Sequence, residues 1–347
     1  MKHDIFNTIP NNLVSNKSLN TNKSHESIKA FVVGEDFAGM RSQSLGLAER
    51  AGWDGIFYPV ALNSVTRLVL SGPVWTRQLF LQRWDKSQLE TCFKGADPPV
   101  IISVGGKGGA VGAVLRSKQH PVVQVQHPRQ SLSRFDLVIA CRHDEVSGPN
   151  VLIGRTAVHG LTRDRLEAAR QLWAPRWKSL PRPIIGVLLG GSNGRYRFTK
   201  KDAHRLGQIL LNTIRAEKGS LIVTPSRRTS SAVLSILFHY IQQAGGLLWN
   251  GEGENPYNGL IACADSLVVT IDSISMASEA VAGNAPVTIF PLVGSSRRIN
   301  HFIDELELSG RIRVLDPTED RLPKSWYVQP LDDTDDVIGE MHQRLGF

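Results

Sequence analysis

Short apolar runs rich in β-branched residues recur along the chain, and each is followed by a polar turn and then by a stretch with helical spacing. Runs such as 28–33, 99–103 and 221–224 are typical of buried strands. Strand, turn and helix in this repeated order indicate parallel sheets covered by helices. The pattern therefore predicts an α/β protein that binds ligands beyond the carboxyl ends of its strands.

The pattern stops and restarts around a proline-bearing segment. Residues 174–183 contain three prolines and predict an interdomain linker. On either side, residues 28–173 and 184–316 predict two Rossmann-like domains facing each other across a cleft, which suits a chain of 347 residues. Residues 317–347 are a C-terminal segment with the option of packing back on the first domain. Residues 1–27, rich in Asn, Ser, Thr and Lys, predict a disordered tail.

The turn after the apolar run 266–271 has the richest chemistry, because acidic and hydroxyl side chains lead there into a predicted helix over 276–281. Hydroxyls and free backbone N–H groups at a helix start bind anions, and a carboxylate one turn further on can reach the hydroxyls of a ribose. The turn is therefore typical of a nucleoside diphosphate site, although a helix cap with a solvated glutamate explains it equally well. The candidate residues are Asp272, Ser273, Ser275, Ser278 and Glu279.

Two more turns of the second half follow predicted strands and carry glycine, serine or arginine. They span residues 190–197 and 225–229. Because parallel strands end at the same edge of a sheet, we expect these turns to converge with 272–275 on one anionic ligand. Their candidate residues are Gly190, Gly191, Ser192, Arg227 and Arg228.

The first half offers weaker candidates at its strand ends. A loop with four glycines around Lys107 is expected to cluster backbone N–H groups beside a cation, before a helix through Arg116. Asp36 and His127 are candidates for a general base, and each is also explained by an ordinary structural role. The remaining cleft candidates are Gly105, Gly106, Arg129 and Asn255.

Charge and composition limit the classes of binding partner that the sequence predicts. The formal net charge is +8, which suits an anionic small molecule or an anionic membrane surface; no nucleic-acid-binding module is recognisable. The stretch 63–95 reads as helical and amphipathic, which fits ordinary packing or contact with a membrane. Three distant cysteines and no acidic pair near the turns predict neither disulfides nor a metal site, and no cofactor is expected. With no spanning segment or secretion signal, a cytoplasmic location is expected, with peripheral membrane contact as an added option.

The two halves, the linker and the diphosphate-type turn resemble the GT-B fold of glycosyltransferases, in particular the MurG-like group. The run 272–280, with Gly283–Val287 and Pro291 after it, is similar to the donor-site signature of that group. The resemblance implies that Glu279 binds the ribose of a nucleotide-sugar. Residues 190–192 resemble the group's glycine-rich loop, but from Asn193 onward the sequence departs from it.

A second resemblance is carried by the stretches 124–129, 135–138, 143–144, 148–151, 225–228, 253–257 and 272–280. From about Val32 to Asp316 the chain is similar to the Elm-type mitochondrial fission proteins, which have many bacterial members. The resemblance implies, for plant members, recruitment of a dynamin-related protein to the mitochondrial outer membrane; the chain here looks like a bacterial-type member.

Two hypotheses of different classes follow, and the sequence leaves open whether the protein is an enzyme. In the first, a glycosyltransferase-like protein binds a nucleotide-sugar in the cleft and transfers the sugar without a metal. Lys107 and Arg227 or Arg228 would then stabilise the departing diphosphate, and Asp36 or His127 would activate the acceptor. In the second, a non-catalytic adaptor binds a partner protein or a membrane surface; a nucleotide-sensing module is a third option.

Overall fold

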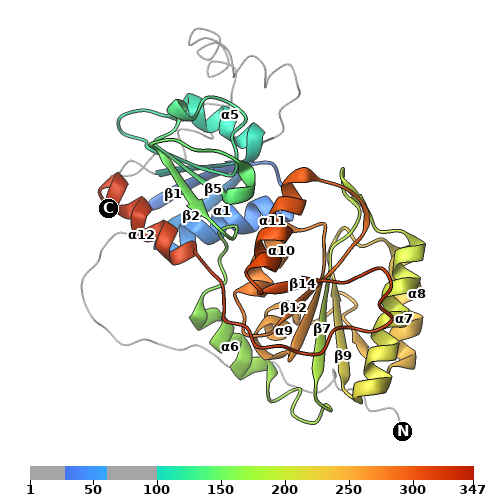
Figure 1. The fold of residues 1–347 in the computed structure, drawn as a ribbon. Helices are drawn as coiled ribbons and strands as arrows, with labels where there is room; N and C mark the ends of the chain where they lie inside the picture. The colour runs from blue at the N-terminus through green and yellow to red at the C-terminus, as the bar shows by residue number, and fades with distance from the viewer. Residues whose placement is uncertain (1–27, 61–99) are drawn as a thin grey trace, which may run out of the picture.

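The computed structural model describes residues 28–60 and 100–347. It contains two six-stranded parallel sheets, each covered by helices on both faces, and the two layered units lie side by side (Figure 1). The two-domain α/β architecture predicted from the sequence is confirmed. The predictions of a disordered tail at 1–27 and an amphipathic element at 63–95 fall outside the described residues.

The first sheet has the strand order β2-β1-β3-β4-β5-β6, and all its neighbouring strands run parallel. Its central strands are completely buried, which explains their continuous apolar runs. The strands are β1 (Lys29–Gly34), β2 (Asp54–Pro59), β3 (Val100–Val104), β4 (Val122–Val125), β5 (Leu137–Cys141) and β6 (Val151–Gly154).

Of the helices in the described residues, two cover one face of this sheet and one covers the other. Helix α1 (Ala38–Arg50) and the C-terminal helix α12 (Thr334–Leu345) share a core cluster with β1 and β3, whereas α5 (Gly105–Leu115) packs on the opposite face. Short 3-10 turns η1 (Leu132–Arg134) and η2 (Arg142–Asp144) lie before and after β5.

The glycine-rich segment after β3 is helical rather than a loop. Helix α5 begins at Gly105, so Gly106 and Lys107 lie in its first turn. Its glycines allow close packing: a Cβ on Gly108 would lie 2.5 Å from the carbonyl oxygen of Val33. Likewise the polar, glycine-containing stretch 34–43 suits a loop by local pattern, yet α1 begins within it at Ala38. In both places tertiary packing overrides the local glycine and polar signals.

The second sheet has the order β10-β9-β7-β11-β12-β14, again with all neighbours parallel. Its strands are β7 (Ile184–Leu189), β9 (Ser220–Pro225), β10 (Leu247–Leu248), β11 (Ser266–Thr270), β12 (Val287–Phe290) and β14 (Ile312–Val314), with a separate antiparallel pair β8 (Tyr196–Arg197) and β13 (Val293–Gly294). Helices α7 (Lys200–Glu217) and α8 (Ser231–Gln243) cover one face. The other face carries α6 (Arg163–Trp173), α9 (Tyr257–Cys263), α10 (Ile274–Val281) and α11 (Arg297–Leu308).

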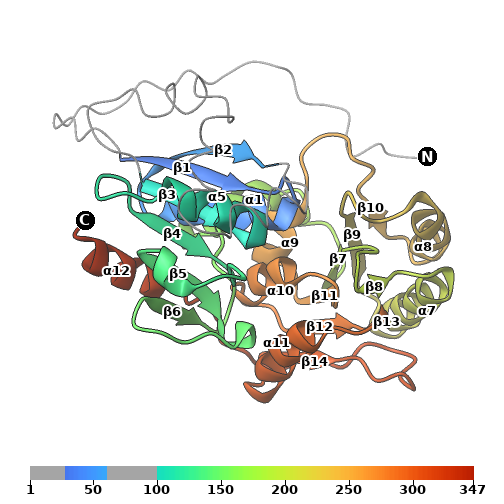
Figure 2. The same cartoon turned by 90° about the horizontal axis from the view of Figure 1, so that it is seen from above.

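Within residues 100–347 the chain passes between the two units twice. Helix α6, which we assigned to the first domain, packs in the second core instead, where a Cβ on Gly259 would lie 2.4 Å from the Trp173 ring. After β14 the chain returns: Leu322 and Leu331 belong to the second unit's cores, and α12 then packs on α1 and β6. As Figure 2 shows, α10 and α11 lie on the side of the second unit that faces the first.

Candidate functional site: an interdomain pocket

The three turns singled out in the second unit meet at one sheet edge, because β9, β7 and β11 are neighbours in that order. The backbone N–H of Gly190 donates to Thr270 Oγ1 at 2.7 Å, and the N–H of Gly191 donates to Asp272 Oδ2 at 3.0 Å. From the third turn, Ser226 Oγ donates to the carbonyl oxygen of Gly190 at 2.9 Å. The turns therefore form one hydrogen-bonded unit.

Asp272 is the centre of that unit. Its carboxylate is buried and accepts from Thr270 Oγ1 at 2.6 Å, while Arg228 Nη2 lies 2.8 Å from Oδ2. Burial raises the pKa of Asp272, and the contacts with Thr270, Arg228 and Gly191 oppose that rise. The Asp272 carboxylate is thus bound by groups of the protein itself, namely a hydroxyl, a guanidinium and a backbone N–H.

The two glycines are required sterically in this unit. A Cβ on Gly190 would lie 2.2 Å from Asp272 Oδ1, and one on Gly191 would lie 2.1 Å from the carbonyl oxygen of Arg228. Neighbouring hydroxyls are also engaged: Ser192 Oγ accepts from the N–H of Phe198 at 3.0 Å, and Ser273 Oγ caps α10 by accepting from the N–H of Met276 at 3.3 Å. The turn 190–192 is thus shaped by Asp272 and Arg228.

Glu279 lies at the boundary between the two units. Its Oε2 accepts from Tyr257 Oη at 2.5 Å, and its Oε1 accepts from Ser42 Oγ of α1 at 2.9 Å. Burial raises the pKa of Glu279, and the hydrogen bonds from Tyr257 and Ser42 oppose that rise. One turn away on α10, Ser275 Oγ accepts from Gln43 Nε2 at 2.7 Å. Helices α1 and α10 are therefore joined by two side-chain hydrogen bonds.

Ser278 makes a further contact at this boundary. It is fully buried, and its hydroxyl accepts from the backbone N–H of Ala157 at 3.0 Å. Gly39 on α1 is a point of close approach, since a Cβ there would lie 2.9 Å from Ser275 Oγ. The small residues of α10 thus serve the contact between the units as well as the turn at its start.

Beside Glu279 an open pocket of about 450 Å³ lies between the two units. Its lining residues come from α1, from the start of α6 and from α9, together with Arg227 of the turn after β9. Within the described part of the chain the Arg227 guanidinium has no ion-pair partner, whereas its neighbour Arg228 is held by Asp272. The pocket lining includes Arg41, Ser42, Arg165, Arg227, Tyr257 and Glu279.

The first-domain candidates lie outside the lining of this pocket. Asp36 is exposed and pairs with Arg41 at 3.2 Å, and His127 Nδ1 accepts from the backbone N–H of Arg129 at 2.8 Å. Lys107 pairs with Glu35 at 2.8 Å. Only Asp36 is linked to the pocket, because its partner Arg41 is a lining residue.

Asn255 has a structural position at the start of α9. Its Oδ1 accepts from the backbone N–H of Tyr257 at 3.0 Å and from Thr224 Oγ1 at 3.1 Å. It therefore fixes Tyr257, which ends the stretch 253–257 but was not among the candidate site residues. Ser42 and Gln43 were not candidates either, because the local pattern of 34–43 does not indicate a helix that faces the second unit.

A family model described as "Mitochondrial fission ELM1" matches residues 38–345, which is most of the chain. The chain belongs to the mitochondrial fission ELM1 family. A curated family relative, the mitochondrial fission protein ELM1 of Arabidopsis thaliana, is 30% identical over 275 residues, covering 72% of this chain and 64% of the relative. The chain thus spans less than two thirds of that relative's length. An uncharacterized protein of Rickettsia prowazekii (strain Madrid E) is 24% identical over 318 residues, covering 80% of this chain and 87% of the relative.

Solved structures show the fold of this ELM1-family chain. A variant of Os79 from O. sativa, in complex with UDP, has a TM-score of 0.54 at 10% identity, covering 91% of this chain and 90% of that one. The UDP-GlcNAc 2-epimerase of Methanocaldococcus jannaschii, in complex with UDP-GlcNAc and UDP, has a TM-score of 0.50 at 12% identity, covering 92% and 100%. The predicted GT-B-like arrangement is confirmed. Among the helices described, none combines the length and apolarity needed to cross a membrane.

Proposed function

We propose that this ELM1-family protein binds a nucleotide-diphosphate sugar in the interdomain pocket. The observation that carries the proposal is that Glu279 of α10 and Arg227 of the turn after β9 line one pocket of about 450 Å³. A carboxylate can accept hydrogen bonds from both ribose hydroxyls, and a guanidinium suits a diphosphate. A volume of this size is within the usual range of small-molecule sites.

Glu279 keeps the capacity to bind a ribose although both its oxygens have partners. Each carboxylate oxygen accepts more than one hydrogen bond, so a ribose hydroxyl can join or replace Ser42 at Oε1. Tyr257 holds Oε2 from the same unit and fixes the direction of the carboxylate. In this proposal Arg227, with Arg41 and Arg165 nearby, attracts the diphosphate, while the unit around Asp272 gives the turns their shape.

UDP is the first nucleotide to test, because two proteins of similar fold were solved with it. We further propose that the protein transfers the sugar to an acceptor hydroxyl without a metal ion at the diphosphate. Asp36 is preferred to His127 as the general base, since its ion pair with Arg41 places it beside the pocket lining.

A thermal-shift screen with UDP, GDP and CDP tests the proposal. A nucleotide at a hundredfold excess over its dissociation constant stabilises the protein by about 2.7 kcal/mol. We expect one nucleotide to raise the melting temperature, and Glu279→Gln to remove about half of the rise or more at the same nucleotide concentration. The matched control is Glu340→Gln, which changes an exposed ion pair on α12. No shift with any nucleotide would contradict the proposal.

Family membership favours a second candidate, an adaptor without transfer activity that binds a partner protein or an anionic membrane surface. The membrane version predicts co-sedimentation with vesicles that contain anionic lipid, and this binding should weaken as salt is added. It would place the protein in the cytoplasm with peripheral membrane contact. Absence of binding at low salt would contradict it.

A further inference from the structure

Three side chains with metal-ligand chemistry gather where β5 ends, away from the nucleotide pocket. The Cys141 sulfur, a His143 ring nitrogen and an Asp144 carboxylate oxygen all lie within 4.8 Å of one another, and all three residues are buried. One tight turn brings them together: the backbone N–H of Cys141 donates to Asp144 Oδ2 at 3.1 Å, and Glu145 ends the turn at φ 53°.

His143 is the anomaly in this cluster. Its side chain is fully buried, yet neither ring nitrogen has a hydrogen-bond partner. The Phe302 ring packs edge-on against the imidazole, with the two ring centroids 5.2 Å apart. Buried polar atoms are nearly always paired, so this one requires an explanation. Nε2 lies 3.8 Å from Asp144 Oδ1, too far for a hydrogen bond. Donors about 2.1 Å from one tetrahedral zinc ion lie roughly 3.4 Å apart, so a small side-chain movement would let both bind it.

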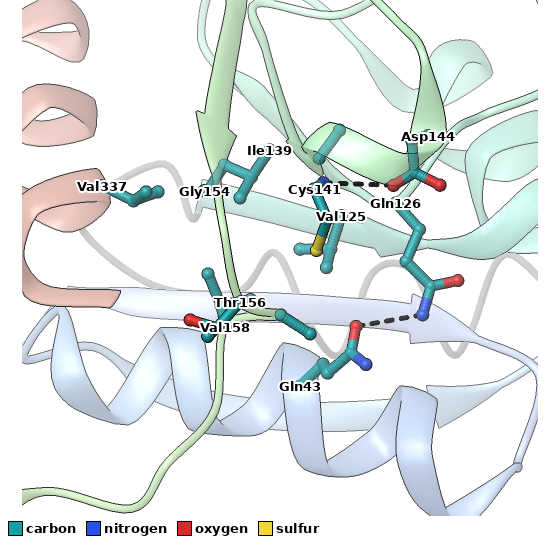
Figure 3. Close-up of a pocket in the computed structure, with 12 residues that line it drawn as sticks. Gln43, Val125, Gln126, Ile139, Cys141, Asp144, Gly154, Thr156, Val158 and Val337 are labelled. Atoms are coloured by element: carbon teal, nitrogen blue, oxygen red, sulfur yellow. Dashed lines mark hydrogen bonds between the residues drawn. The ribbon is translucent and has the colours of Figure 1, made fainter. Parts of the chain in front are cut away.

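A small cavity adjoins the cluster on its other side. It has a volume of about 10 Å³, and Cys141 and Asp144 line it together with Gln43, Gln126 and Thr156. Figure 3 shows the Cys141 sulfur pointing into this space. A volume of that size is about enough for one water molecule. A water there could complete a coordination shell that three protein side chains leave open.

We propose that Cys141 Sγ, His143 Nε2 and Asp144 Oδ1 form a site for one zinc ion. Thiolate, imidazole and carboxylate together are a donor set that zinc prefers, and magnesium or calcium would not use the sulfur. On binding, the S–H bond of Cys141 breaks, a sulfur–zinc bond forms and the proton leaves to solvent. The site is independent of the proposed nucleotide binding.

The second unit contributes to this site through Arg298 of α11, whose Nε lies 2.6 Å from Asp144 Oδ1. The carboxylate oxygen has a further lone pair, so Arg298 can remain as an outer partner of the ligand. Its positive charge nevertheless opposes a cation at the same oxygen. Replacing Arg298 should therefore keep or tighten zinc binding, whereas replacing a ligand should weaken it.

Cobalt titration of a full-length protein with Cys141 as its sole thiol tests the site. This background carries Cys92→Ser and Cys263→Ser, and Cys92 lies outside the described residues. We expect one cobalt ion per chain, a sulfur-to-cobalt charge-transfer band and displacement by one equivalent of zinc. Replacing Cys141 by Ser should remove the band, and His143→Ala should weaken binding at least about tenfold, because each removes a donor. Arg298→Gln should keep or tighten the affinity.

Three results would overturn the proposal. They are no stoichiometric binding or no charge-transfer band in the background protein, unchanged affinity when Cys141 or His143 is replaced, and loss of binding in Arg298→Gln. The first result is measured on the background protein, in which all three ligand residues are present, so it does not depend on the folding of a variant that lacks a ligand. Circular dichroism of the others checks their fold.

Discussion

Ser42 Oγ on α1 donates a 2.9 Å hydrogen bond to Glu279 Oε1 on α10, across 237 positions of sequence and from one parallel sheet's helix layer to the other's. The carboxylate proposed to bind a ribose is therefore also a contact between the two units. Nucleotide binding at Glu279 and the fit of α1 against α10 must affect each other, because they use the same oxygen atom.

Glu279→Gln should weaken UDP binding by about tenfold to a hundredfold. A hydrogen bond to a charged group contributes roughly 1.5–3 kcal/mol, and the amide presents one acceptor oxygen instead of two. Isothermal titration measures the affinity, with Glu340→Gln expected to leave it unchanged. Equal affinity in Glu279→Gln and the unmodified protein would refute the role of the carboxylate.

Arg227 and Arg228 are adjacent in sequence and should behave differently. Arg227→Gln removes a cation from the pocket lining and should weaken UDP binding severalfold and reduce its dependence on salt. Arg228→Gln leaves the buried Asp272 without its ion pair and should instead lower the free energy of unfolding by about 2 kcal/mol. Urea denaturation and titration of both variants separate the two effects; an exchange of the two phenotypes would show that the assignments are reversed.

Tyr257→Phe should lower the affinity for UDP by roughly fivefold to tenfold, since it removes the hydroxyl that holds Glu279 Oε2 and costs about 1 kcal/mol. The matched control is Tyr327→Phe at an exposed tyrosine. Because Tyr257 acts through Glu279, the double variant with Glu279→Gln should bind no more weakly than Glu279→Gln alone. Additive losses would argue for two independent contacts.

Asp332 fixes the C-terminal segment to the first unit through Arg50, at 2.7 Å. Burial would raise the pKa of Asp332, but His159, Thr334 and Arg50 together lower it below its ordinary 3.8. Its stabilising contribution is thus present above pH 3.8 and lost as the pH falls through the lowered value. Asp332→Asn should cost about 1–3 kcal/mol at neutral pH and progressively less in acid.

Urea denaturation over a pH series measures that difference, and Asp320→Asn, at an exposed position, should show none of it. A stability gap between Asp332→Asn and the unmodified protein that stays constant down to the most acidic pH would mean that the carboxylate charge is not the cause.

The central strands of both sheets were predictable from the sequence because their apolar runs are continuous. The meeting of the turns at 190–192, 225–229 and 272–275 also followed, since adjacent parallel strands end at one sheet edge. The local pattern could not show which polar groups of those turns bind one another. Asp272 looks like a ligand-binding carboxylate in the sequence, and in the structure it accepts hydrogen bonds from its own fold.

Contacts between the units were beyond local pattern altogether. Gln43 and Ser275 are 232 positions apart, and no spacing rule relates them. The glycines around Lys107 suggested a loop, but they permit a helix pressed closely against β1 and β3. Similarly, the prolines after α6 marked a boundary, while Trp173 had already entered the second core.

A crystal structure of the protein grown with UDP would show whether the interdomain pocket is the nucleotide site. We expect nucleotide density between α1 and α10, with the ribose hydroxyls on Glu279 and the diphosphate facing Arg227. Density at another place on the molecule, or an unoccupied pocket in crystals grown at saturating UDP, would contradict it.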